Sequence, residues 1–226
     1  MSFLKRLKTR TKSAILDYKD QNEGTASIEF VFVAPLMIFL YVGLYELSIA
    51  YTVNGTINRA SEVAASFPTF EQSLDEVTLS NIMTASAAVI DYPQFNINNL
   101  AIDVYSVEQE GDTPDTRRLV GKAGYEGTGA AGLLKDLSAT DFAGNLSSLT
   151  AGKGFIVAQV AYRYEPFIST RFVDTVTLAD RKILNPRENQ GQALNITTTA
   201  AQERANLTCT PDNNNVFTCS FSGQVP

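Results

Sequence analysis

The hydrophobic pattern of the chain is dominated by one block near its N-terminus. Sixteen residues from Phe30 to Tyr45 pass without a charge, and the mostly apolar stretch around them covers the 26 residues from Ile28 to Val53. A membrane-spanning helix needs about 20 residues, whereas a secretory signal has an apolar core of roughly 7–15 residues followed by a small-residue cleavage site. The block is too long for a signal and no such site follows it, so it predicts a transmembrane helix.

A second pattern continues this helix beyond the block. Ile57, Ala60, Ala64 and Phe67 recur at steps of three or four, which places them on one face of a helix. Pro68 then ends the helix. The predicted helix therefore covers residues 25–67, about 64 Å at a rise of 1.5 Å per residue. Its apolar stripe is expected to pack either on the protein's own domain or on neighbouring subunits, and the pattern does not choose between the two.

The remaining chain predicts a small α+β domain, residues 68–190, with an antiparallel sheet. We expect a helical segment over 71–90 and a β-branched strand over 100–108. A core strand over 155–164 and a further strand near 173–178 follow. On one face of the core strand every residue is apolar or aromatic: Ile156, Ala158, Val160, Tyr162 and Tyr164.

Two stretches of this part of the chain are poor in such patterns. Residues 111–153 are rich in Gly, Asp, Thr and Ser, which predicts a long irregular insertion, and a short helix is expected at 133–137. The Asn/Thr-rich tail, residues 191–226, predicts an appendage closed by a disulfide bond between Cys209 and Cys219, the only cysteines, if it lies outside the cytoplasm.

The charge distribution predicts the orientation in the membrane. The net charge of −6 combines +3 in the leader, residues 1–24, with −9 in the rest. Six Lys and Arg precede the apolar block, and the next basic residue is Arg59. Because basic flanks stay on the cytoplasmic side, we expect a single-pass protein with a cytoplasmic N-terminus and an extracytoplasmic C-terminal domain. The acidic body also argues against nucleic acid as a partner.

The sequence offers no candidate for catalysis. The chain has no histidine, the commonest metal ligand and general base, and we expect no catalytic residues, cofactor or metal. The run from Gly127 through Gly129 to Gly132 spells a dinucleotide fingerprint, but no convincing strand precedes it, so a loop is the better interpretation. An anchored hydrolase would need a Ser–Lys or paired-carboxylate site, and we recognise no motif for either in the sequence.

Two carboxylates stand within or beside the apolar block. Glu29 lies at its start and Glu46 well inside it. A charge at mid-membrane costs about 2.5–3.5 kcal/mol on insertion scales, so an intramembrane acid is a hypothesis of function. The alternative is that both side chains reach the interfaces and play no further part.

The context of Glu29 resembles a known processing site. Gly24 ends the basic leader, and Glu29 and Phe30 follow at the fifth and sixth positions after it, directly before the apolar helix. This G-x-x-x-x-E-F arrangement resembles the prepilin-peptidase recognition site of type IV pilin-like proteins of the Flp branch. The resemblance implies cutting between Gly24 and Thr25, and pairing of Glu29 with the new α-amine of a neighbouring subunit.

The helix resembles the TadE/TadF family of minor pseudopilins of the tight-adherence pilus. The features are Gly24 with Glu29, Pro35 within the apolar run, and Gly43 followed by Glu46 and Leu47. Further on, Gly154–Pro166 resembles a family strand, and Arg181–Gly191 favours the TadF-like side.

This resemblance implies a non-enzymatic inner-membrane protein with a periplasmic domain that takes part in assembly or priming of the pilus. Glu29, Glu46 and Pro35 would serve assembly. The implied partners are the prepilin peptidase, other minor and major pilins, the inner-membrane assembly platform and membrane lipid. The alternative is an anchored sensor or binding ectodomain that is never cleaved.

Overall fold

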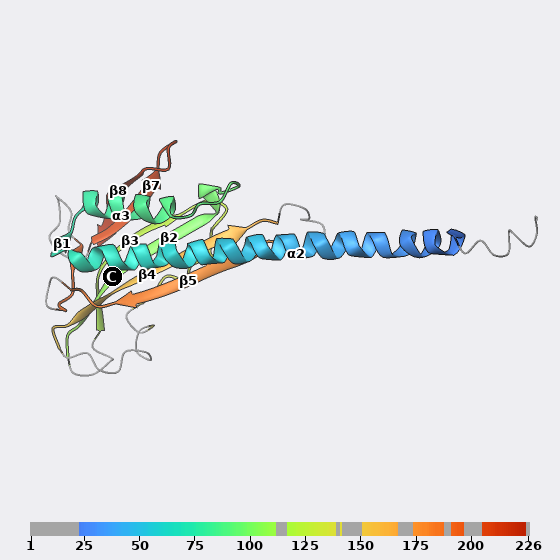
Figure 1. The fold of residues 1–226 in the computed structure, drawn as a ribbon. Coiled ribbons are helices and arrows are strands. Elements are labelled where there is room, and N and C mark those ends of the chain that lie inside the picture. Colours follow the sequence, from blue (N-terminus) through green and yellow to red (C-terminus); the bar gives the residue numbers. More distant parts are fainter. Residues whose placement is uncertain are drawn as a thin grey trace, which may run out of the picture. The chain divides into compact units, whose positions relative to one another are not determined.

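The computed structural model describes residues 23–111, 117–138, 141, 151–166, 174–187, 191–196 and 205–224 (Figure 1). The chain divides into two compact units, Met1–Ser48 and Ile49–Pro226. The leader predicted over residues 1–24 lies outside the described residues up to position 22. Helix α2, Glu23–Ser66, supplies all of the described part of the first unit and begins the second.

The first unit is a stretch of helix with an exposed apolar surface. Apart from Val42, the large apolar side chains between Ile28 and Leu47 are 51% to 76% exposed. Pro35 lies inside the helix, as the sequence predicted for the span. Among the described residues, this is the one helix long and apolar enough to cross a membrane. A long apolar N-terminal helix ahead of an α+β domain is therefore confirmed.

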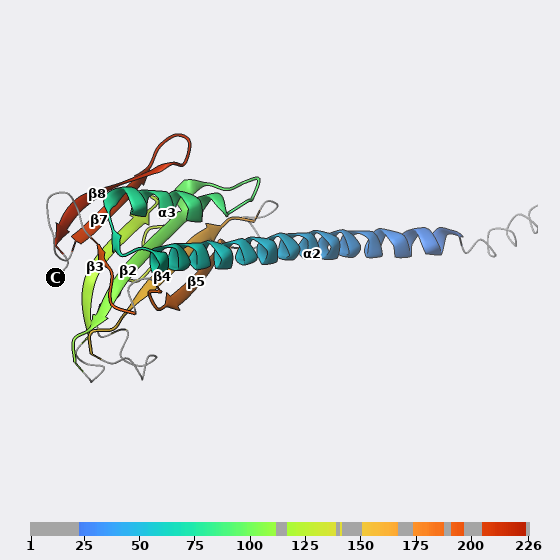
Figure 2. The ribbon, with the colours of Figure 1, turned by 60° about the vertical axis from the view of Figure 1, so that its left-hand side comes forward.

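The second unit is built on a six-stranded sheet with the order β5-β4-β2-β3-β7-β8 (Figure 2). All neighbouring strands are antiparallel except β3 and β7, which pair in parallel. The predicted antiparallel sheet is therefore corrected to a mixed one. The strands are β2 (Leu100–Gln109), β3 (Arg117–Glu126), β4 (Gly154–Tyr164), β5 (Val176–Leu184), β7 (Ala205–Pro211) and β8 (Phe217–Gln224).

Shorter elements complete the unit. After α2 the chain forms the 3-10 helix η1 (Phe67–Phe70), the short strand β1 (Ser73–Leu74), helix α3 (Glu76–Ala88) and the 3-10 helix η2 (Ile97–Asn99). Strand β6 (Asn195–Ile196) pairs in parallel with β1 to make a separate two-stranded sheet. The helical segment predicted over 71–90 is thus shorter, because Asp75 caps α3 by accepting a hydrogen bond from the amide of Thr78.

The core of this unit lies between the sheet and the two helices. From α2 it contains Val53, Ile57, Ala60, Ala64 and Ala65, none more than 1% exposed. From β4 it contains the five residues predicted to share its apolar face, so that prediction is confirmed. The stripe of α2 therefore packs on the protein's own sheet, except for Phe67, which is 52% exposed. Burial of Val53 and Ile57, each giving about 1.5–3 kcal/mol, holds this stretch of helix on the sheet, and the three alanines let the helix approach closely.

A polar contact also links helix α2 to strand β5 of the sheet. The hydroxyl of Ser61, which is fully buried on α2, donates a hydrogen bond to the carboxylate of Asp180 on the edge strand β5. Asp180 also lies 3.3 Å from the ammonium of Lys182. The same hydroxyl also lies 2.9 Å from the carbonyl oxygen of Asn58 within the helix, so the contact with Asp180 links α2 to β5 at this point without being the only partner of the hydroxyl.

The irregular insertion predicted over 111–153 contains an interior strand of the sheet. The segment of β3 carries Gly, Lys and Arg rather than a strong strand composition, and its pairing with β2 and β7 supplies what local propensity lacks. The short helix expected at 133–137 is absent: residues 133 and 134 form a bend and residues 135–138 have no regular structure, and the segment lies over the other face of the sheet. There Leu137, 5% exposed, joins Tyr105, Val107, Phe155 and Val157 in a second apolar cluster.

The C-terminal tail is not an appendage. Strands β7 and β8 extend the main sheet beyond β3, and Ala205, Leu207 and Cys209 enter the core. Helix α3 binds β8 through its hydroxyls: Ser80 donates to the carbonyl of Phe217 at 2.7 Å and accepts from the amide of Cys219 at 3.0 Å. The alternation of buried and exposed residues along β7 explains why this polar segment can pack.

Candidate functional site

The predicted processing and assembly residues lie at different positions along helix α2. The backbone of Gly24 and Thr25 belongs to the first turn of the helix. Glu29 and Phe30 follow, and both side chains are exposed. Glu46 is half-buried and lies about 25 Å along the axis from Glu29, at 1.5 Å per residue. The structure therefore does not bring the two carboxylates together.

The arrangement has a simple chemical consequence for this helix. Between Glu29 and Glu46 no charged side chain interrupts the exposed apolar surface. Such a surface is stable in lipid or against other apolar helices rather than in water. One carboxylate stands near each end of this surface, that of Glu29 exposed and that of Glu46 half-buried.

The predicted disulfide partners face each other on adjacent strands. Cys209 of β7 and Cys219 of β8 are a register pair and are joined by a disulfide bond. Their residues are 1% and 4% exposed and belong to the helix-side core. The cross-link therefore closes the β7–β8 hairpin inside the domain.

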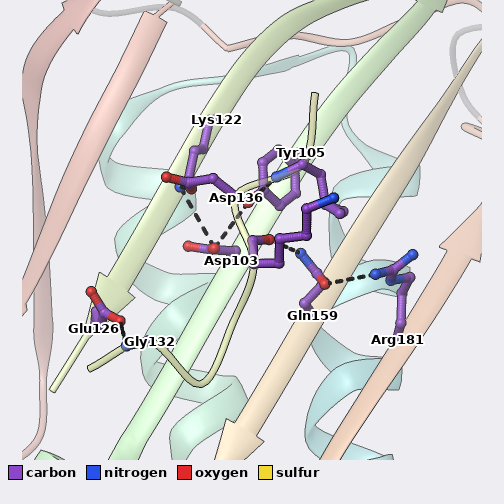
Figure 3. A network of polar contacts seen from close by, with 10 residues as sticks. Asp103, Tyr105, Lys122, Glu126, Gly132, Asp136, Gln159 and Arg181 are labelled. Carbon is purple, nitrogen blue, oxygen red and sulfur yellow. Dashed lines mark hydrogen bonds and ion pairs between the residues drawn. The ribbon is translucent and has the colours of Figure 1, made fainter. Parts of the chain in front are cut away.

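A polar cluster that sequence reasoning missed lies on the outer face of the sheet, opposite the helices (Figure 3). The ammonium of Lys122 on β3 is 3.6 Å from the carboxylate of Asp103 on β2 and also forms an ion pair with Asp136. The hydroxyl of Tyr105 donates to Asp103 at 3.0 Å. The ammonium lies 5.3 Å from the centre of the Tyr105 ring, a distance that suits a cation–π contact.

The segment that carries Asp136, residues 132–138, is here called the strap. Its carbonyl at Lys135 accepts from the side chain of Gln159 at 3.4 Å, and its amide at Leu137 donates to the Tyr105 hydroxyl at 3.4 Å. At the other end, the amide of Gly132 donates to the carboxylate of Glu126 at 2.6 Å. These contacts and the burial of Leu137 hold the strap against the sheet.

Burial sets the protonation preferences of the cluster. Loss of hydration raises the pKa of the Asp103 carboxyl above its ordinary 3.8, although Lys122 and the Tyr105 hydroxyl oppose this. Burial and the neighbouring Asp103 also raise the pKa of Tyr105 well above its ordinary value. Asp103 therefore holds a proton more readily than a surface aspartate, and Tyr105 stays a hydrogen-bond donor.

A pocket of about 360 Å³ adjoins the cluster, lined by Asp103, Lys122 and Asp136 together with β7 residues. Among the described residues no group of His, Cys, Asp and Glu side chains is arranged to hold a metal ion. Two glycines of the fingerprint-like run serve packing: a Cβ on Gly127 would collide with the carbonyl of Asn98, and one on Gly129 with the side chain of Asn99. The third, Gly132, has open space around it and a positive φ of 73°. The one sequence signal for the cluster was an acid, Asp103, inside an apolar strand.

Comparison with known proteins bears on the helix alone. The sequence model of the family described as TadE-like protein matches residues 24–66. The match thus begins at the glycine of the predicted processing site and ends with the last residue of α2. No curated protein and no solved structure matches the chain. The match supports the TadE-like side of the resemblance, and the TadF-like preference drawn from residues 181–191 stays a prediction.

Proposed function

We propose that the protein is a minor pseudopilin of a tight-adherence pilus and acts, without catalysis of its own, in assembly or priming of the fibre at the inner membrane. The observation that carries this proposal is the TadE-like match, whose span coincides with helix α2. In this proposal residues 27–48 of the helix lie in lipid and among other pilins. The second unit then stands in the periplasm.

Processing is the first step of the proposal. A prepilin peptidase cuts between Gly24 and Thr25, which removes the basic leader and creates a free α-amine at Thr25. Without the leader, the remaining helix begins with uncharged residues up to Glu29. The exposed Glu29 then pairs with the α-amine of a neighbouring pilin, because each group would otherwise be a charge in a weakly polar surrounding.

The other positions act in packing. Pro35 removes one helical hydrogen bond and gives the span a site of bending. Glu46 stands near the outer end of the span, where it can reach water or a basic group of the assembly platform. Tyr41, Tyr45 and Tyr51 lie in the same region and are suited to the interface between lipid and water.

Mapping the mature N-terminus tests this proposal. In cells that make the pilus, mass spectrometry should find a chain that starts at Thr25, and cells without the peptidase should retain the leader. Gly24→Arg should block cutting, while the matched Gly24→Ala variant should be partly processed. A retained leader in piliated cells would favour an anchored sensor or binding ectodomain instead.

A separate measurement tests the orientation. Tyr51 is 80% exposed, and the two native cysteines are joined to each other. A Tyr51→Cys variant should react with a membrane-impermeant maleimide added from the periplasmic side. Labelling only after the cytoplasmic side is opened would contradict the proposed topology.

A further inference from the structure

The outer-face cluster holds an amine and a carboxyl group in contact, with a buried acid beside them. Lys122 Nζ pairs with Asp136 of the strap and lies 3.6 Å from Oδ2 of Asp103. The Lys122 side chain is 21% exposed and that of Asp103 is 11% exposed, so the amine approaches Asp136 from the protein side. The ring of fully buried Tyr105 lies beside the ammonium.

The position of Asp136 is fixed although its side chain is 86% exposed. The residues on both sides of it are hydrogen-bonded to the sheet, Lys135 through Gln159 and Leu137 through Tyr105. Leu137 is buried in the outer apolar cluster. The carboxyl carbon of Asp136 therefore stays close to Lys122, and holding two reactants in place can be worth an effective molarity of about 10⁵–10⁸ M.

A second lysine–aspartate contact in the same region provides a comparison. Lys135 Nζ lies 2.7 Å from Asp141, and the amide and hydroxyl of Ser138 also donate to that carboxylate. Hydrogen bonds from Lys135 and Ser138 lower the pKa of Asp141, which keeps this acid ionised. No described carboxyl side chain other than Asp141 itself is paired with Lys135. Lys135 and Asp141 are therefore in contact, but among the described residues they have no buried acid beside them, as Lys122 and Asp136 have in Asp103, that could transfer a proton.

We propose that Lys122 and Asp136 become joined by an intramolecular isopeptide bond, with Asp103 as the proton-transfer group. The ammonium of Lys122 passes one proton to the carboxylate of Asp136, which leaves a neutral amine and a neutral carboxyl group. The Nζ lone pair attacks Cγ of Asp136 and forms the C–N bond. Asp103 accepts a second proton from Nζ and returns one to the departing hydroxyl, the C–O bond breaks, and one water molecule leaves.

The bond would tie the strap covalently to β3. Burial raises the pKa of Asp103, so this acid is suited to carry a proton through the reaction. Exposure of Asp136 lets water solvate its carboxylate, which slows the step, so the linked fraction should rise with time after folding. The disulfide closes the β7–β8 side of the same sheet, and the isopeptide would close the strap side.

Intact-mass measurement of the denatured full-length chain tests the proposal. After prolonged incubation the wild-type protein should be one water molecule lighter than its processed, disulfide-bonded sequence. Trypsin should then leave a branched peptide that joins Lys122 to Asp136, since an acylated lysine is not cleaved. Full mass after incubation, with cleavage after Lys122, overturns the proposal.

Matched variants assign the roles. Lys122→Arg and Asp136→Ala should keep full mass, and Asp136→Asn should give the same linked product as wild type with ammonia as the leaving molecule. Asp103→Asn keeps the shape and should lose the linkage while circular dichroism shows a folded protein. Continued linkage in Asp103→Asn would overturn the role of Asp103. A branched peptide at Lys135 and Asp141 would overturn the argument that a buried acid is required.

Discussion

Helix α2 contains two stretches that are both apolar and yet have opposite surroundings. Between Phe30 and Tyr45 the chain carries no charged residue, and its large apolar side chains other than Val42 are at least half exposed. In the second stretch, the residues Val53, Ile57, Ala60 and Ala64 recur at steps of three and four and are almost fully buried on the sheet. A continuous apolar run suits contact all round with lipid or other helices, and a stripe suits one protein face. The spacing of apolar residues, more than their number, separates the two roles.

The largest effect is expected from a charge placed in the buried stripe. Ile57→Asp removes a fully buried side chain and places an unpaired carboxylate in the core of the second unit. We expect a loss above about 4 kcal/mol in the free energy of unfolding, enough to prevent folding of a marginally stable domain. Thermal unfolding of the full chain in detergent micelles measures this loss.

The control for that change lies on the same helix. Tyr51→Asp adds the same charge at an 80% exposed position, and its melting temperature should stay within a few degrees of wild type. Equal melting temperatures for Ile57→Asp and wild type would show that the stripe does not hold the helix on the sheet.

The next largest effect is expected from Glu29→Ala, which should weaken association with pilin partners without affecting folding. Glu29→Ala should leave the second unit folded and the helix inserted, because removal of a charge makes insertion in lipid easier. If Glu29 pairs with a neighbour's α-amine, that amine is left unpaired, and recovery of pilin partners by co-purification should fall strongly. Glu62→Ala changes an exposed carboxylate in the second stretch and should have no such effect. Normal partner recovery by Glu29→Ala would favour a side chain that only reaches the interface.

A smaller effect is expected from the cross-link. Replacing both Cys209 and Cys219 by Ser opens a short loop, which the chain-entropy model values at about 2–3 kcal/mol. Because both residues are buried in the core, the loss should lower the stability of the whole second unit rather than loosen a tail. Denaturant unfolding of the full chain gives the free-energy change.

The neighbouring register pair provides the control for the cross-link. Thr210 and Thr218 face each other on the same two strands and are exposed, so their joint replacement by Ser should cost little. If the cysteine variant unfolds at the same denaturant concentration as wild type, the disulfide has no role in the stability of the sheet.

The smallest effect concerns the start of α3. Asp75→Ala removes the side chain that accepts from the amide of Thr78 at 2.7 Å, and loss of an N-cap costs about 0.5–2 kcal/mol. The side chain and backbone of Thr78 also lower the pKa of Asp75 below its ordinary 3.8. The ionised form is favoured in the folded state, so its contribution is present above pH 3.8 and is lost as the pH falls through the lowered pKa.

Asp75→Asn separates these two parts of the effect. The asparagine keeps a capping oxygen and does not titrate, so its free energy of unfolding should vary less below pH 3.8 than that of wild type. Parallel pH curves for the two proteins would contradict the assigned cause.

Local patterns were sufficient for part of the domain. β2 and β4 follow from runs of β-branched and aromatic residues, and burial on the helix side of β4 agrees with its alternation. β3 was missed because its residues carry weak strand preference, and β7 and β8 were missed because Asn and Thr dominate their surroundings. The polar cluster could not be predicted from the sequence, because Asp103, Lys122 and Asp136 meet only when two strands and the strap are in place.

The sequence by itself determined helix α2, its apolar span and its apolar stripe, because helix periodicity is local and the place of each residue in the repeat gives its face of the helix. That the stripe packs on the protein's own sheet was decided by the tertiary structure. It also determined the register of Gly24 and Glu29 on which the processing hypothesis depends. The tertiary structure decided how the sheet is completed. Parallel pairing of β7 with β3 joins segments about 80 residues apart, and burial against α3 stabilises it rather than any local preference. The same packing placed the amine of Lys122 between the carboxylates of Asp103 and Asp136 on the outer face. No spacing in the sequence indicates this contact.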